Sequence, residues 1–176
     1  MRHLLRLLRL GPLLALSLAL SGCFVSWIPL IAPDNASFPF ERIVFHVADH
    51  PDEIHVLQRD GDHYRMTSAD PPGKNALVRL KAVTDDVWVA QAWPPPERET
   101  GKDRPFLYAL LVVGEDRAEV SAYAVVKPAD FVPRAGLEPC ERAICVEDLD
   151  VYAAYAVARA EAGMAPDIAY RLLERE

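Results

Sequence analysis

The stretch that decides the fold reads FLYALLVVGEDRAEVSAYAVV and runs from residue 106 to residue 126. Its first part, Phe106–Val113, is apolar at every position, as in a strand that is buried on both faces. The turn residues Gly114-Glu115-Asp116 follow, and apolar side chains then recur at every second position from 118 to 126. This arrangement predicts two antiparallel strands joined by a short turn.

The chain before this hairpin repeats the pattern. Strands are predicted at residues 42–47, 53–58, 63–67, 76–83 and 87–93, with turn signals such as Asp60-Gly61 between them. A charged, Pro-rich segment at 94–105 is a loop, because proline cannot occupy a central strand. Sequential hairpins form a meander, so residues 40–127 are predicted to build a bent or barrel-like antiparallel sheet of about six or seven strands.

The C-terminal part changes to a helical period. Apolar residues at 149, 152, 153 and 156 predict a helix over 148–162, with Asp148 and Asp150 in its first turn and Gly163 as its stop. A second short helix is predicted from Pro166 to Leu173, since proline is favoured in a first helical turn. The expected fold class is therefore α+β, with an antiparallel β-meander and one or two C-terminal helices.

Composition limits the function classes. The 176 residues carry a formal net charge of −7, and 51% are hydrophobic, which is the balance of a globular protein. The length suits a single domain with a sizeable core. The acidic balance argues against a nucleic-acid partner, because such proteins usually present a basic face.

The first 22 residues have the features of an export signal. Three arginines precede an apolar stretch at 10–20 that is too short to span a bilayer comfortably. This stretch ends in Leu20-Ser21-Gly22-Cys23, which resembles the lipobox of bacterial lipoproteins. The resemblance implies cleavage before Cys23, diacylglycerol transfer to its thiol and usually N-acylation, with a fatty acyl group such as palmitate. Phe24 stands where an Asp would favour inner-membrane retention, so we expect an outer-membrane lipoprotein that faces the periplasm.

The expected organisation is a cleaved signal peptide (1–22), a lipid-anchored tether (23–39) and one globular domain (40–176). The apolar residues between Phe24 and Ile31 leave two possibilities open. They could rest at the membrane interface, where Trp27 would be favoured, or they could form a strand of the domain.

The other two cysteines, Cys140 and Cys145, are predicted to form a disulfide in an oxidising periplasm. The bond would fix the segment at 128–146 between the last meander strand and the helix. A redox pair is the alternative, but redox centres favour the Cys-x-x-Cys spacing.

Histidines and aspartates are interleaved between residues 46 and 63, which suits a transition metal. A two-residue turn at Asp60-Gly61 places His55 and His63 on opposite faces of the hairpin. A three-residue turn instead places them on one face, where His50 could join them as metal ligands. The alternative is that these histidines are polar residues on exposed strand faces and turns.

No catalytic motif is present, so we expect no enzymatic activity and no cofactor. Two functions remain open. One is a structural or interaction module, bound to the membrane through lipid on Cys23, that contacts another envelope protein and exposes an apolar patch. The alternative is a module that binds a small apolar ligand inside the meander, or a metal through its histidines.

Overall fold

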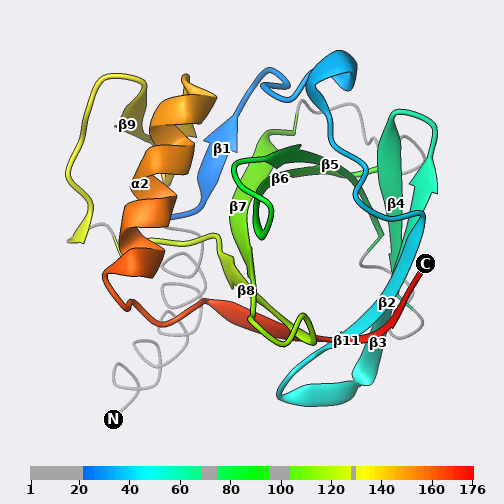
Figure 1. The fold of residues 1–176 in the computed structure, drawn as a ribbon. Coiled ribbons are helices and arrows are strands. Elements are labelled where there is room, and N and C mark those ends of the chain that lie inside the picture. Colours follow the sequence, from blue (N-terminus) through cyan, green and yellow to red (C-terminus); the bar gives the residue numbers. More distant parts are fainter. Residues whose placement is uncertain (1–21, 69–74, 96–103, 128–129) are drawn as a thin grey trace, which may run out of the picture.

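The computed structural model describes residues 22–68, 75–95, 104–127 and 130–176 (Figure 1). Strands predominate in the described part, which also contains one α-helix. Its elements in chain order are β1 (Phe24–Ser26), η2 (Pro33–Asn35), β2 (Arg42–Val47), β3 (His50–Asp60), β4 (His63–Ser68), β5 (Ala76–Ala82), β6 (Val87–Trp93), β7 (Phe106–Val113), β8 (Glu119–Tyr123), β9 (Leu137–Cys140), β10 (Ala143–Val146), α2 (Leu149–Glu161) and β11 (Ile168–Arg175). The signal sequence expected at 1–22 lies outside the described residues apart from Gly22.

Eight antiparallel strands close into a barrel. Strands β2 to β8 follow one another as hairpins, β6 pairs with β7, and β11 lies between β8 and β2 to complete the ring. Figure 1 looks into this barrel, with α2 and β9 outside it on the side of β1 and β7. The predicted meander is confirmed, and its strands at 42–47, 87–93 and 106–113 have the predicted bounds.

The second C-terminal helix is a wrong prediction. Residues Ile168–Arg175 form β11, whose backbone pairs with Val120 and its neighbours on one side and with Phe45 and its neighbours on the other. Without β11 the meander would present two open strand edges, and pairing them outweighs a modest helical preference. The fold is therefore β-rich with one C-terminal helix in the described chain, and it is less evenly α+β than the sequence indicated.

Three further strands extend the sheet outside the barrel. Strand β8 pairs with β7 only over Leu110–Val113, and β1 takes the free edge at Phe106–Tyr108. Strand β10 then pairs with β1 in parallel, and β9 with β10. Phe24 is fully buried, so this part of the expected tether at 23–39 belongs to the folded body, as the strand alternative proposed.

Helix α2 has the predicted position. Asp148 is its N-cap and accepts hydrogen bonds from the backbone N–H groups of Asp150 (2.9 Å) and Val151 (3.2 Å). Gly163, with φ +74°, ends it in a left-handed conformation that other residues adopt with difficulty. The buried face of α2 places Tyr152 against Phe24, with ring centroids 4.9 Å apart.

The described residues form two apolar cores, one on each side of the barrel wall. The outer core lies between α2, β1, β10 and the outward side chains of β6 and β7, including Val89 and Leu110. The inner core comprises inward side chains such as Phe45 and Leu80. Strand β7 contributes to both, which explains why its sequence is apolar at every position.

Candidate functional site

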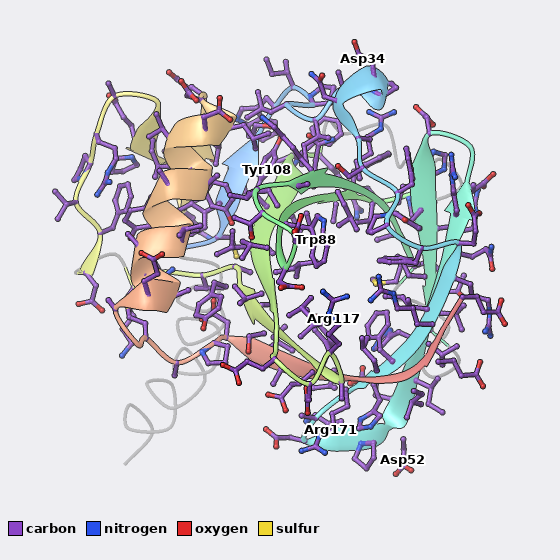
Figure 2. The ribbon with its side chains drawn as sticks, in the orientation of Figure 1. Asp34, Asp52, Trp88, Tyr108, Arg117 and Arg171 are labelled. Atoms are coloured by element: carbon purple, nitrogen blue, oxygen red, sulfur yellow. A yellow bond between two sulfur atoms is a disulfide. The ribbon has the colours of Figure 1, made fainter. Side chains whose placement is uncertain are left out.

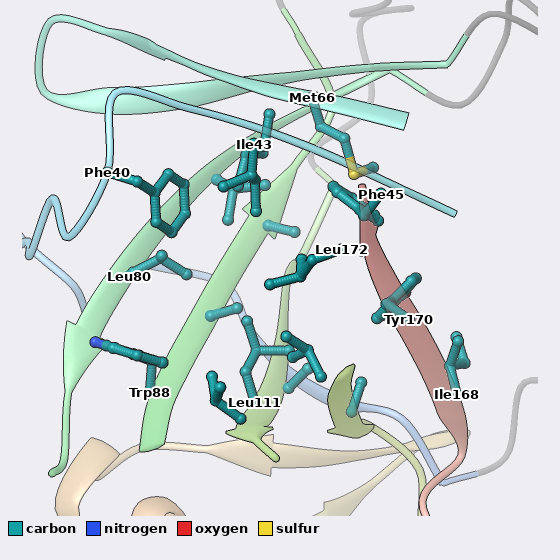
Figure 3. Close-up of a pocket in the computed structure, with 18 of the residues that line it drawn as sticks. Phe40, Ile43, Phe45, Met66, Leu80, Trp88, Leu111, Ile168, Tyr170 and Leu172 are labelled. Atoms are coloured by element: carbon teal, nitrogen blue, oxygen red, sulfur yellow. The ribbon is translucent and has the colours of Figure 1, made fainter. Parts of the chain in front are cut away.

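The barrel interior contains a cavity of about 240 Å³ (Figure 3). All eight barrel strands contribute lining residues, at alternate positions that point inward. Nearly all of these residues are apolar. The cavity therefore offers van der Waals contact on all sides and few hydrogen-bond partners.

Small side chains keep the barrel hollow. An eight-stranded barrel is just wide enough to be filled by its own side chains or to hold one small ligand. Here alanines occupy inward positions on three consecutive strands: Ala90 and Ala92 on β6, Ala109 on β7, and Ala122 on β8. The sequence left open a ligand site inside the meander, but the alternation did not reveal which face was inside, so it did not identify the lining residues.

One end of the barrel is narrowed by aromatic side chains that precede β2. The ring of Tyr64 lies 4.7 Å from that of Phe40 and 5.6 Å from that of Phe38. The Tyr64 hydroxyl donates a hydrogen bond of 2.8 Å to the Phe40 carbonyl oxygen. Burial raises the pKa of Tyr64 to about 12, so this hydroxyl stays protonated at neutral pH. Phe40 itself lines the cavity.

The turns at the same end are joined by an ion pair. Arg117, in the β7–β8 turn, lies 3.2 Å from the carboxylate of Asp86 in the β5–β6 turn. In Figure 2, Arg117 lies within the outline of the barrel ring. Both side chains are more than half exposed, so the pair contributes little to stability. It nevertheless neutralises two charges at this end of the barrel.

His55 lies on the inner side of the barrel wall. It is 5% exposed and stacks on Phe45, with ring centroids 5.3 Å apart. Burial lowers its pKa, so the imidazole is neutral near pH 7, and in the described chain its Nδ1 has no hydrogen-bond partner. Tyr170 contacts the other side of Phe45 edge-on at 5.2 Å, and burial raises its pKa.

The structure separates the histidines that were considered as metal ligands. Asp60 pairs with His63, so the hairpin loop is Gly61-Asp62 and neither expected register occurs. Gly61, with φ +65°, supplies the left-handed conformation at the first loop position. His55 consequently faces inward, whereas His63 faces outward with its Nδ1 2.8 Å from Asp62. His50 is exposed at the start of β3. Among the described residues no three His, Cys, Asp or Glu side chains are grouped to hold a metal ion.

The cysteines lie outside the barrel. Cys140 and Cys145 are bonded across the β9–β10 hairpin, with their Cα atoms 5.6 Å apart. Cys23 is partly exposed, and its carbonyl oxygen accepts a 2.9 Å hydrogen bond from the Ile144 N–H. Partial burial, followed by the nearby Asp167 carboxylate, raises the pKa of the Cys23 thiol.

Across the ranges that the structure describes, no helix has both the length and the apolar character needed to span a membrane. No protein-family model, curated protein or solved structure matches the chain.

Proposed function

We propose that this protein is a lipid-anchored binding protein of the bacterial outer membrane, whose barrel holds one slender apolar ligand on the periplasmic side. The observation that supports binding is the apolar cavity inside the barrel, which opens to solvent. An interaction module would need an exposed patch and no interior space, so the cavity favours the ligand-binding alternative. The lipobox resemblance at Leu20-Ser21-Gly22-Cys23 supports the anchor.

The size of the cavity suggests the shape of its ligand. Sites for small molecules usually measure about 300–1,000 Å³. A cavity of about 240 Å³ lies just below that range, which suits one flexible hydrocarbon chain better than a large ring system. Burial of such a chain would be driven by the removal of its apolar surface from water.

The lipid anchor would hold the barrel close to the membrane. Phe24 already belongs to the sheet, so no flexible spacer separates Cys23 from the folded body. Trp27 and Ile28 follow within five residues of the anchor and are 60% and 65% exposed. Tryptophan is favoured at the membrane interface, so this short exposed segment is compatible with contact between the protein and the lipid surface.

Trp88 provides a direct test of ligand binding because it lines the cavity. The full-length chain, stripped of lipid on a hydrophobic resin, would be titrated with a brominated fatty acyl chain, which quenches tryptophan fluorescence on contact. We expect saturable quenching that is mostly lost in Trp88→Phe. Trp93→Phe is the matched control, because Trp93 lies on the same strand and packs outside the barrel against Phe106. No quenching, or quenching unaffected by Trp88→Phe, would overturn the proposal.

The anchor is tested separately by cell fractionation. Cys23→Ala should move the protein from the membrane fraction to the soluble fraction, because thioether attachment requires the thiol. Continued membrane association of this variant would contradict lipidation at Cys23.

A further inference from the structure

Among the described residues that line the cavity, one side chain is charged. Arg175, near the end of β11, lines the cavity together with Ile43, its partner on β2. No aspartate or glutamate occurs among the lining residues of the described chain. Arg175 is exposed, so it lies where the apolar interior meets solvent.

A β-bulge turns Arg175 toward the cavity. Leu172 is paired with Phe45 and faces inward, and regular alternation would then place Glu174 inward as well. The pairing instead shifts between Leu172 and Glu174, so that Glu174 lies opposite Val44 and Arg175 opposite Ile43. Bulges commonly redirect a side chain in this way. The shift exchanges an inward carboxylate for an inward guanidinium.

Two acidic side chains near the end of β11 and the start of β2 pair with other arginines. Glu174 pairs with Arg42 at 2.9 Å, and Glu41 pairs with Arg59 at 2.9 Å. Arg175 itself has no ion pair within the ranges that the structure describes. Its positive charge is therefore available to a ligand at the cavity entrance.

We propose that the ligand is an anionic amphiphile with one acyl chain, whose headgroup binds the Arg175 guanidinium while its chain fills the cavity. This inference rests on the proposed function and adds the chemical class of the ligand. A guanidinium suits this role because its planar N–H donors match a carboxylate or a phosphate and its charge persists at any physiological pH. The headgroup could be the carboxylate of a free fatty acid or the phosphate of a single-chain lipid.

The test compares three probes of equal chain length: a fatty acid, an alkyl phosphate and a fatty alcohol. Each would compete with the brominated chain for the full-length protein. We expect at least one anion to bind about tenfold or more tightly than the alcohol, since hydrogen bonds to charged groups are worth at least a tenfold change in affinity. The preferred anion then distinguishes a free fatty acid from a phospholipid as the source.

Two variants test whether Arg175 causes the preference for an anion over the alcohol. Arg175→Gln should reduce the affinity for the preferred anion to about that for the alcohol and leave binding of the alcohol unchanged. Arg171→Gln is the matched control, because Arg171 lies on the same strand and faces outward beside Glu119. Equal binding of acid, phosphate and alcohol, or an anion preference that survives in Arg175→Gln, would overturn the inference while the proposed function stands. If none of the three probes binds, both fail.

Discussion

Gln91 connects the N-terminal segment to the barrel wall, and its replacement by leucine is the most informative test of that attachment. Gln91 is fully buried on the outer face of β6. Its Oε1 accepts hydrogen bonds from the backbone N–H groups of Leu30 (2.8 Å) and Ile31 (2.8 Å) and from the Tyr108 hydroxyl (2.9 Å). Leucine has a similar volume and can accept none of them, so Gln91→Leu removes the acceptor and keeps the packing.

The expected loss of stability depends on which of the three hydrogen-bond donors still have another acceptor after the substitution. The Leu30 N–H also lies 3.2 Å from the Tyr108 hydroxyl, and that hydroxyl also lies 2.8 Å from the Ser26 hydroxyl. Ile31 loses its acceptor entirely, which costs about 1–3 kcal/mol for a buried donor. The other two bonds weaken by about 0.5 kcal/mol each. The substitution also removes the buried Gln91 Nε2, which has no hydrogen-bond partner in the described chain, and this offsets about 1 kcal/mol of the loss. Gln91→Leu should therefore lower the free energy of unfolding by about 1–3 kcal/mol.

Urea unfolding measures this change, and amide hydrogen exchange locates it. Exchange should accelerate at Leu30 and Ile31 and stay slow in β4, because the hydrogen bonds of Gln91 hold only the N-terminal segment. Gln58→Leu is the control, since Gln58 is exposed on β3 and its side chain donates to the Glu41 carbonyl oxygen. The reasoning would be refuted if Gln91→Leu lowered the free energy of unfolding no more than Gln58→Leu does and amide exchange at Ile31 stayed slow.

Three further predictions concern the disulfide, the buried phenol and the cavity. Replacing both Cys140 and Cys145 by serine should lower the free energy of unfolding by about 2 kcal/mol, the value for closing so short a loop, as measured by urea unfolding. The raised pKa of Tyr64, about 12, means that the folded state holds this proton more tightly than the unfolded state. Stability should thus be unaffected by this group below about pH 10 and fall between pH 10 and 12, with a shallower fall in Tyr64→Phe. Ala109→Phe should fill the cavity and abolish quenching of Trp88 by the brominated chain, while circular dichroism stays that of the barrel.

The meander could be predicted from the sequence because the local strand and turn patterns agree with the strand pairing in the folded barrel. In β5 the apolar residues Val78 and Leu80 alternate with Arg79 and Lys81, and the polar turn before the apolar strand β6 contains Asp85 and Asp86. Each strand pairs with its neighbour in the chain, so no long-range information is needed. Helix α2 was equally predictable from the sequence, since Asp148 and Gly163 mark its two ends.

The cavity could not be predicted in the same way. A strand that alternates small and large apolar residues is compatible with either face pointing inward, and β7 is apolar on both. Only barrel closure shows that Ala109 points into the barrel while Leu110 packs on its outside against the outer core. The register of the β3–β4 hairpin had the same ambiguity, because one residue of slippage reverses which face His63 occupies.

Strand β11 shows most clearly why local sequence was insufficient. Ile168, Tyr170 and Leu172 alternate as a strand requires, yet Pro166 and the following alanine, leucine and arginine residues favour a helix. What selects the strand is the pair of open edges on β2 and β8, which lie more than 40 residues away in the chain. The bulge after Leu172 arises from that same non-local pairing. The position of Arg175 at the cavity is therefore a property of the closed barrel, and no pattern within residues 168–175 could have revealed it.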